Sequence, residues 1–206
     1  MNKLFSKSNH RSSKKQPVIV VSGLPRSGTS MMMRMLAEGG VPVITDELRR
    51  PDSDNPKGYF ELEPVRQMTD GNVAWLEHAD GKAVKVISAL LEHLPSTHSY
   101  KVIFLERDLQ EILASQRKML MNRKEEEMGD EKVIEEQIQK HLSAMRPWLV
   151  RQPNMEVLYV NYNALMSKPG PLCEQIAEFL DLPLNQTRML AVPDQSLYRN
   201  RIADEK

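Results

Sequence analysis

Cysteine is almost absent from this 206-residue chain, which contains one residue of that type, Cys173. A single thiol cannot form a disulfide within the chain or supply a cysteine-rich zinc site. The shortage of cysteine is typical of reducing compartments, so it predicts a cytoplasmic location. His93, His98 and His141 also lack the spacing of a metal site, and we expect no bound metal.

Net charge and long apolar runs are absent too. Lys plus Arg and Asp plus Glu number 28 each, so no overall charge favours a nucleic-acid or anionic-membrane partner. No stretch approaches the ~20 apolar residues of a membrane-spanning helix. Residues 1–16 are basic and polar, the apolar run after them is too short for a signal peptide, and we expect a disordered basic N-terminal arm. Residues 17–206 suffice for a single domain with one core.

Short apolar runs rich in β-branched residues alternate with longer segments of helical period, which is typical of parallel strands joined by helices. The clearest strands are predicted at residues 17–22, 101–106 and 157–160, with weaker patterns at 41–44 and 83–87. Helices are predicted at residues 30–38, 109–121, 130–148 and 171–180. The sequence therefore predicts an α/β fold with three α/β/α layers, in which a central, mostly parallel sheet has about five strands.

The strongest local signal is a turn at the end of the first predicted strand, Gly23-Leu24-Pro25-Arg26-Ser27-Gly28-Thr29-Ser30. Its glycines let the backbone curl tightly, so that amides of the turn and of the following helix point at one anion. Thr29 and Ser30 add hydroxyl donors. A nucleoside-triphosphate loop reads GxxxxGK[ST], but Thr29 stands in place of its lysine and Arg26 puts a cation inside the turn. This pattern favours a shorter phosphate-bearing ligand over a full triphosphate.

Residues 25–30 resemble the 5′-phosphosulfate loop of sulfotransferases that use 3′-phosphoadenosine 5′-phosphosulfate (PAPS). In that family a later strand ends in an arginine, a serine follows eight positions on, and the two hold the 3′-phosphate. Arg107 and Ser115 match this layout, and Asp108 is a suitable N-cap for the intervening helix. Because the carboxyl ends of parallel strands face one crevice, both motifs can bind one nucleotide. The resemblance implies a P-loop NTPase-like domain and sulfuryl transfer from PAPS.

Sulfuryl transfer requires a base and a cation. The segment from Asn55 to Glu61 is similar to an Asn-Pro-x-Gly-aromatic-aromatic-Glu segment of bacterial members of the family. The resemblance implies Glu61 as the catalytic base, with Glu63 in reserve and His78 as a weaker alternative. Either glutamate alone is equally compatible with an acid at a helix N-terminus. Arg26 is the candidate for stabilising the departing 5′-phosphate.

Several assignments stay open at this level. Lys85 either lines the cleft or covers the sheet edge with its aliphatic stem. The family brings a basic C-terminal segment over the nucleotide, and Arg199 and Arg201 are candidates for it, although the usual Arg-Lys-Gly loop is absent. A kinase or nucleotide hydrolase, with Glu106 holding Mg²⁺, and a non-catalytic nucleotide-binding protein are the other two functions. The acceptor hydroxyl or amine can belong to a small molecule, a carbohydrate, a lipid or a peptide, and the oligomeric state is open.

Overall fold

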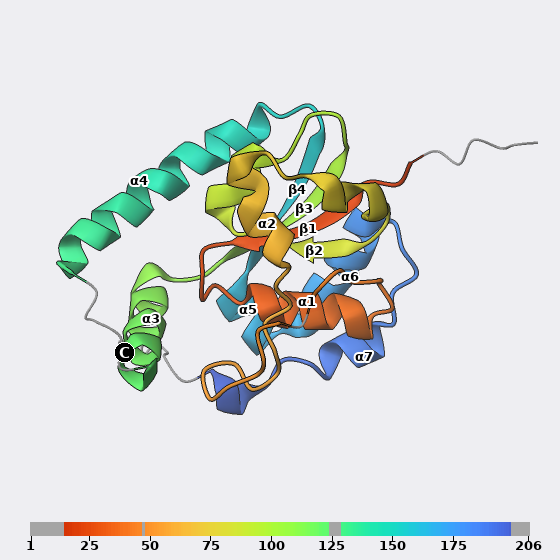
Figure 1. The fold of residues 1–206 in the computed structure, drawn as a ribbon. Coiled ribbons are helices and arrows are strands. Elements are labelled where there is room, and N and C mark those ends of the chain that lie inside the picture. The colour runs from red at the N-terminus through yellow and green to blue at the C-terminus, as the bar shows by residue number, and fades with distance from the viewer. Residues whose placement is uncertain (1–14, 47, 124–128, 199–206) are drawn as a thin grey trace, which may run out of the picture.

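A parallel sheet of four strands forms the centre of the structure, a computed structural model that describes residues 15–46, 48–123 and 129–198. The strands are β1 (Val18–Gly23), β2 (Ala83–Lys85), β3 (Tyr100–Glu106) and β4 (Met155–Asn161). Their order is β2-β1-β3-β4, with every pair parallel (Figure 1). The three clearest strand predictions are confirmed, and the pattern at 83–87 gives a shorter strand.

The segment at residues 41–44 does not form the fifth strand that its pattern predicts. Val43 makes one isolated parallel bridge with Ala83. Ile44 N–H donates to the Ala83 carbonyl, and Ala83 N–H donates to the Pro42 carbonyl. Pairing stops there because Pro42 has no N–H to donate and because β2 is only three residues long. The sheet has four strands, close to the predicted number.

Helices cover both faces of the sheet, which confirms the three-layer fold (Figure 1). One face carries α1 (Thr29–Glu38), α5 (Tyr162–Ser167), α6 (Pro169–Leu180) and α7 (Gln186–Leu190). The other carries α2 (Glu63–Arg66), the 3-10 helices η1 (Gln67–Asp70), η2 (Ala74–His78) and η3 (Ser88–His93), and the long helix α4 (Glu131–Val150). Helix α3 (Leu109–Arg123) follows β3, and η4 (Gln195–Leu197) lies near the end of the described chain. No helix within the described ranges is long and apolar enough to cross a membrane.

Alternating side chains of β1 divide the core into two halves. Val18 and Val20 pack with Phe104 and with residues of α4 on one face. Ile19 and Val21 pack with residues of α1 and α6 on the other. Fully burying one such side chain contributes roughly 1.5–3 kcal/mol, and all six residues of β1 are buried. Burial of the whole strand therefore fixes the position of its carboxyl end, from which the next loop begins.

Candidate active site

A cavity of about 400 Å³ opens at the carboxyl edge of the sheet. Because β1 and β3 pair in parallel, with Gly23 opposite Leu105, the loop after β1 and the residues after β3 leave the sheet side by side. Pro25, Arg26, Arg107 and Ser115 all line the cavity. Open α/β sheets bind their ligands at this position.

The turn between β1 and α1 depends on its two glycines. Gly28 has a φ of 99°, and a Cβ there would lie 2.4 Å from Cδ2 of Tyr162. A Cβ on Gly23 would lie 2.6 Å from Oγ of Ser27 and 2.7 Å from the Leu105 carbonyl. The turn is thus packed against β3 and α5 too closely for any side chain at either position.

The N-terminus of α1 offers donors to an anion from outside the chain. Gly28, its N-cap, supplies no side-chain bond, and the first turn of this helix, all of it described, contains no acidic residue. Oγ of Ser27 is buried and has no hydrogen-bond partner among the described residues. Leaving such a group unsatisfied costs about 1–3 kcal/mol. Uncapped amides and an orphaned hydroxyl therefore fit a phosphate or sulfate group.

The other two hydroxyls of the turn are placed differently. Ser30 Oγ donates to the carbonyl of Tyr59 at 3.1 Å, so this hydroxyl ties α1 to the segment before Glu61. Thr29 is the first residue of α1 and is buried. The sequence predicted hydroxyl donors at Thr29 and Ser30, whereas the buried hydroxyl without a partner among the described residues is that of Ser27.

Arg26 joins the two predicted motifs. Its Nε donates to Ser115 Oγ at 3.0 Å and its Nη2 to the Asp54 carbonyl at 3.3 Å. Its own carbonyl accepts from Arg107 Nη1 at 2.9 Å. Burial lowers the pKa of Arg26, and the neighbouring cations Arg107 and Arg49 act in the same direction, against Tyr59 and Asp54. Burial and the neighbouring cations thus disfavour the charged form of Arg26, and a bound anion would stabilise it.

Arg107 is held by a partner that sequence reasoning missed. Its Nε lies 2.9 Å from Oε2 of Glu111, and the two side chains are only 7% and 2% exposed. The other oxygen of Glu111 accepts from Tyr198 Oη at 2.8 Å and from Asn163 Nδ2 at 3.0 Å. The guanidinium carbon of Arg107 also lies 4.5 Å from the Tyr162 ring centroid. The i,i+4 spacing of Arg107 and Glu111 was the available signal.

The predicted C-terminal cover can be followed only in part. Arg199 and Arg201 lie outside the described residues. The preceding Tyr198 places its ring centroid 5.7 Å from the guanidinium carbon of Arg107. Burial, together with its hydrogen bond to Glu111, raises the pKa of Tyr198 to about 12. Tyr198 therefore keeps its proton and remains a donor to Glu111.

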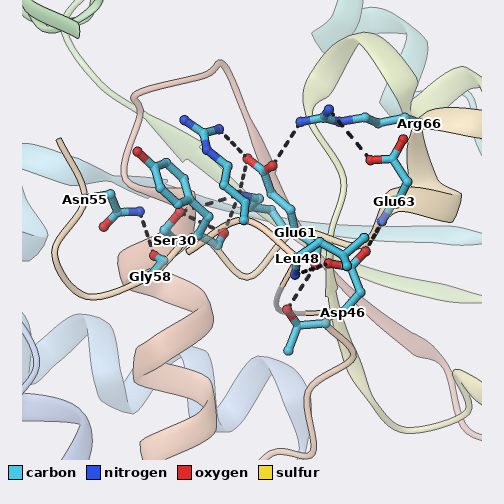
Figure 2. A network of polar contacts seen from close by, with 12 residues as sticks. Ser30, Asp46, Leu48, Asn55, Gly58, Glu61, Glu63 and Arg66 are labelled. Atoms are coloured by element: carbon cyan, nitrogen blue, oxygen red, sulfur yellow. Dashed lines mark hydrogen bonds and ion pairs between the residues drawn. The ribbon is translucent and has the colours of Figure 1, made fainter. Parts of the chain in front are cut away.

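The segment that leads to Glu61 is a compact turn (Figure 2). Asn55 Nδ2 donates to the Gly58 carbonyl, and Tyr59 Oη donates to Asp52 Oδ1, both at 2.6 Å. Phe60 then adopts a left-handed conformation with a φ of 52°. This conformation is unfavourable for a residue with a side chain, and such strain is concentrated at functional sites. It turns the chain so that Glu61 faces the cavity.

Three cations surround the Glu61 carboxylate. Oε1 lies 3.0 Å from Arg49 Nη1 and 3.4 Å from Lys85 Nζ, and Oε2 lies 2.9 Å from Arg66 Nη2 (Figure 2). Glu61 lines the cavity. Glu63 is the first residue of α2, and its half-exposed carboxylate lies 3.7 Å from Arg66 Nη1. Glu61 and Glu63 thus differ in position, and only the former is in contact with the cavity.

Lys85, which the sequence left between two roles, is buried in the cavity wall with 8% exposure. Its Nζ donates to the Tyr59 carbonyl and lies 3.5 Å from Ser30 Oγ. Burial lowers the pKa of Lys85 to about 8, although Glu61 acts in the opposite direction. The ammonium group therefore stands between the turn after β1 and the Glu61 carboxylate.

Two residues proposed for other roles point elsewhere. Glu106, the acid that a kinase would use for Mg²⁺, accepts a hydrogen bond from Arg146 of α4. His78, the weaker candidate base, is an exposed residue at the end of η2 and does not line the cavity. Within the described ranges, no three His, Cys, Asp or Glu side chains are grouped to hold a metal ion.

The chain is similar to known proteins in its domain and in its fold. A family model for the sulfotransferase domain matches residues 16–201, whereas a search of curated proteins gave no match. Mouse sulfotransferase SULT7A1 complexed with PAP has a TM-score of 0.57 at 14% identity, over 94% of this chain and 69% of that chain. Sulfotransferase STF1 from Mycobacterium tuberculosis H37Rv gives 0.53 at 16%, over 90% and 74%. The sulfotransferase domain of the Synechococcus PCC 7002 olefin synthase gives 0.51 at 18%, over 97% and 87%. At these identities the structures show a shared fold.

Proposed function

Because this chain belongs to the sulfotransferase domain family, we propose that it transfers a sulfuryl group from PAPS to a hydroxyl or amine of an acceptor. The observation that carries the proposal is the position of Arg26, which is bonded to both Ser115 and Arg107 inside one cavity. These bonds join two motifs that are far apart in the chain, since Arg26 precedes Arg107 by 81 residues and Ser115 by 89. Membership of the family supports the same reaction class.

The donor fits the groups that surround Arg26. We assign the 5′-phosphosulfate to the N-terminal amides of α1, the Ser27 hydroxyl and Arg26, and the 3′-phosphate to Arg107 and Ser115. The mouse sulfotransferase of this fold was solved with PAP, the bisphosphate that remains when PAPS has given up its sulfuryl group. That complex supports a donor of this type here.

The reaction forms a bond between the acceptor oxygen and sulfur while the bond from sulfur to the 5′-phosphate oxygen breaks. The acceptor proton passes to the Glu61 carboxylate, and the negative charge gathers on the departing phosphate. Arg26 and the amides of α1 stabilise that charge, and each positioned donor of this kind is worth about 3–4 kcal/mol in the transition state. The Lys85 ammonium, 3.4 Å from Glu61, adds positive charge between base and donor. We assign no step to a metal.

Calorimetric titration with PAP tests the donor site. We expect binding that does not require Mg²⁺, and a large loss of affinity in Arg107→Ala because a charge-assisted phosphate contact is removed. Binding of ATP that depends on Mg²⁺, with none of PAP, would instead identify a kinase or nucleotide hydrolase.

Transfer of labelled sulfate from PAPS to a metabolite extract tests the chemistry, with mass spectrometry to find products heavier by one sulfuryl group. Arg26→Ala and Glu61→Gln should each lower the rate at least about tenfold. Glu63→Gln is the matched variant. If it lowers the transfer rate more than Glu61→Gln does, the base is Glu63 rather than Glu61. A chain that binds PAP but makes no sulfated product from any extract is a non-catalytic nucleotide-binding protein.

We also propose that residues 17–206 form a single domain, that the protein is cytoplasmic, and that its acceptor is a small molecule, a carbohydrate or a lipid. The further basic contacts from Arg199 and Arg201 belong with these proposals.

A further inference from the structure

Positive charge is concentrated in the cavity, although Lys plus Arg only balance Asp plus Glu in the whole chain. Eight cationic and three acidic side chains line it. The proposed donor accounts for Arg26 and Arg107, and Lys57 is paired with Asp194 at 3.1 Å. Five cations remain beyond the two at the proposed donor and the Lys57 pair: Arg34, Arg49, Arg66, Lys85 and Lys118.

Three of these five surround Glu61 and form with it what we call the Glu61 cluster: Arg49, Arg66, Lys85 and Glu61 itself. Three cations face one carboxylate, and Glu63, the other acid paired with Arg66, is 3.7 Å from it and half exposed. One carboxylate needs at most one or two such partners. The cluster thus has positive charge in excess at the acceptor end of the cavity.

Exposure rises from the inside of the cluster to the outside. The side chains of Lys85, Arg49 and Arg66 are 8%, 31% and 62% exposed. The guanidinium carbon of Arg49 lies over the Tyr59 ring, 3.4 Å from its centroid, and Nη2 of Arg49 is buried with no hydrogen-bond partner among the described residues. The two arginines are therefore the most exposed cations of the cluster and stand at the mouth of the cavity.

Guanidinium groups are suited to bind an acidic group there. Their planar donors match a carboxylate, phosphate or sulfate in a bidentate way. An ion pair at partly exposed positions adds little to stability, so Arg49 and Arg66 can exchange Glu61 for an anion on a ligand at little cost. Removing cations from a carboxylate also strengthens it as a base.

The wall beside the cluster is apolar. Four apolar side chains near the cluster in the sequence line the cavity: Leu62 and Val65, which lie between Glu61 and Arg66, and Ile87 and Leu90, which follow Lys85. These side chains can cover a hydrocarbon or ring portion of a ligand. The acceptor end thus combines an apolar surface with a cationic mouth.

We propose that the acceptor is an anionic amphiphile, with an acidic group bound by Arg49 and Arg66 and an apolar body against the wall formed by Leu62, Val65, Ile87 and Leu90. Its hydroxyl or amine then reaches Glu61, which the acidic group has relieved of one or both arginines. This inference rests on the proposed sulfuryl transfer, because it assigns the acceptor of that reaction.

Calorimetry with phenylacetate and phenylacetamide tests it, because the two probes share size and ring and differ in charge. PAP-saturated protein at neutral pH should bind phenylacetate about tenfold more tightly than the amide, as one charge-assisted contact is worth roughly that much. Arg49→Gln and Arg66→Gln should each remove most of the preference. Arg117→Gln is the control, since Arg117 is 53% exposed, pairs with Glu131 and does not line the cavity.

The outcomes are distinct. Equal affinity for the two probes, no binding of phenylacetate at millimolar concentration, or a preference that survives in both cluster variants overturns the inference. The PAP titration itself reports on the donor site, so a chain that fails to bind PAP refutes the proposed reaction separately. In that event phenylacetate and phenylacetamide can still be titrated into the free protein to test anion binding by the Glu61 cluster. The two tests are separate, because Arg49 and Arg66 lie outside the phosphate loop.

Discussion

Glu111→Ala is the substitution that most directly tests how the proposed donor site is held together. Glu111 and Arg107 form an ion pair of 2.9 Å whose members are 2% and 7% exposed. Tyr198 and Asn163 donate to the same carboxylate. Replacing Glu111 by alanine leaves the Arg107 cation in a buried place without its anion.

The expected loss of stability is large. Removing one partner of a buried ion pair costs about 3–5 kcal/mol, because the other charge is left uncompensated. In a domain of this size each kcal/mol lowers Tm by about 2–4 °C. The melting temperature of Glu111→Ala should therefore fall by roughly 6 to 20 °C. Glu111→Gln should lose less, because its amide oxygen can still accept a hydrogen bond from Arg107.

Thermal unfolding followed by circular dichroism measures the difference. The matched control is Glu131→Ala, which removes an equivalent partner from Arg117 where the two side chains are 41% and 53% exposed. Exposed pairs contribute about 0–1 kcal/mol, so this variant should melt close to the wild type. Similar Tm losses in the two alanine variants would refute the claim that burial of the Arg107 pair matters.

Two other predictions concern Lys85 and the glycine turn. The transfer rate should fall as pH rises through about 8, where Lys85 loses its proton. In Lys85→Arg, the fall in a pH–rate profile should move to higher pH. A fall at the same pH in this variant would show that Lys85 does not cause it. Since the unfolded chain keeps that proton up to about 10.5, wild-type stability should rise with pH between these values, and denaturant titrations can follow the rise. Gly28→Ala and Gly40→Ala share a φ of 99°, but only the former clashes with Tyr162. Thermal unfolding and PAP titration should show the greater damage in Gly28→Ala, and equal damage would point to backbone strain alone.

The parts of the molecule that sequence predicted are those encoded by neighbouring residues. The conformation of the turn from Gly23 to Ser30 can be predicted from its glycines alone. The Arg107–Ser115 motif is also local, because it spans only the end of one strand and the helix that follows. The four long helices begin and end within two residues of prediction. The short helices α2, α5 and α7 were missed because four to six residues carry too little periodicity.

The acceptor end was less predictable because it depends on contacts between distant segments. Lys85 lies beside Glu61 only because β2 pairs with β1, and the three-residue length of β2 gives no pattern from which to tell its inward face. Arg49 stands in a loop, and nothing in its neighbours indicates that it contacts Tyr59. Sequence thus predicted that the loop after β1 and the end of β3 meet at one place, whereas the cations around Glu61 required the fold.

The strained backbone supports Glu61 over Glu63 as the base. Arg26 and Phe60 have φ values of 71° and 52°, and each such conformation costs on the order of 1–2 kcal/mol. They lie in two segments that contact one another, since Arg26 donates to the Asp54 carbonyl and Ser30 donates to the Tyr59 carbonyl. Strain of this kind persists where the surrounding contacts require one geometry. Glu61 directly follows the strained Phe60 and shares its fixed position against the phosphate loop, whereas Glu63 lies beyond it in α2. A base has to be held at hydrogen-bond distance from the reacting group, and of the two glutamates Glu61 is the one that the loop contacts hold.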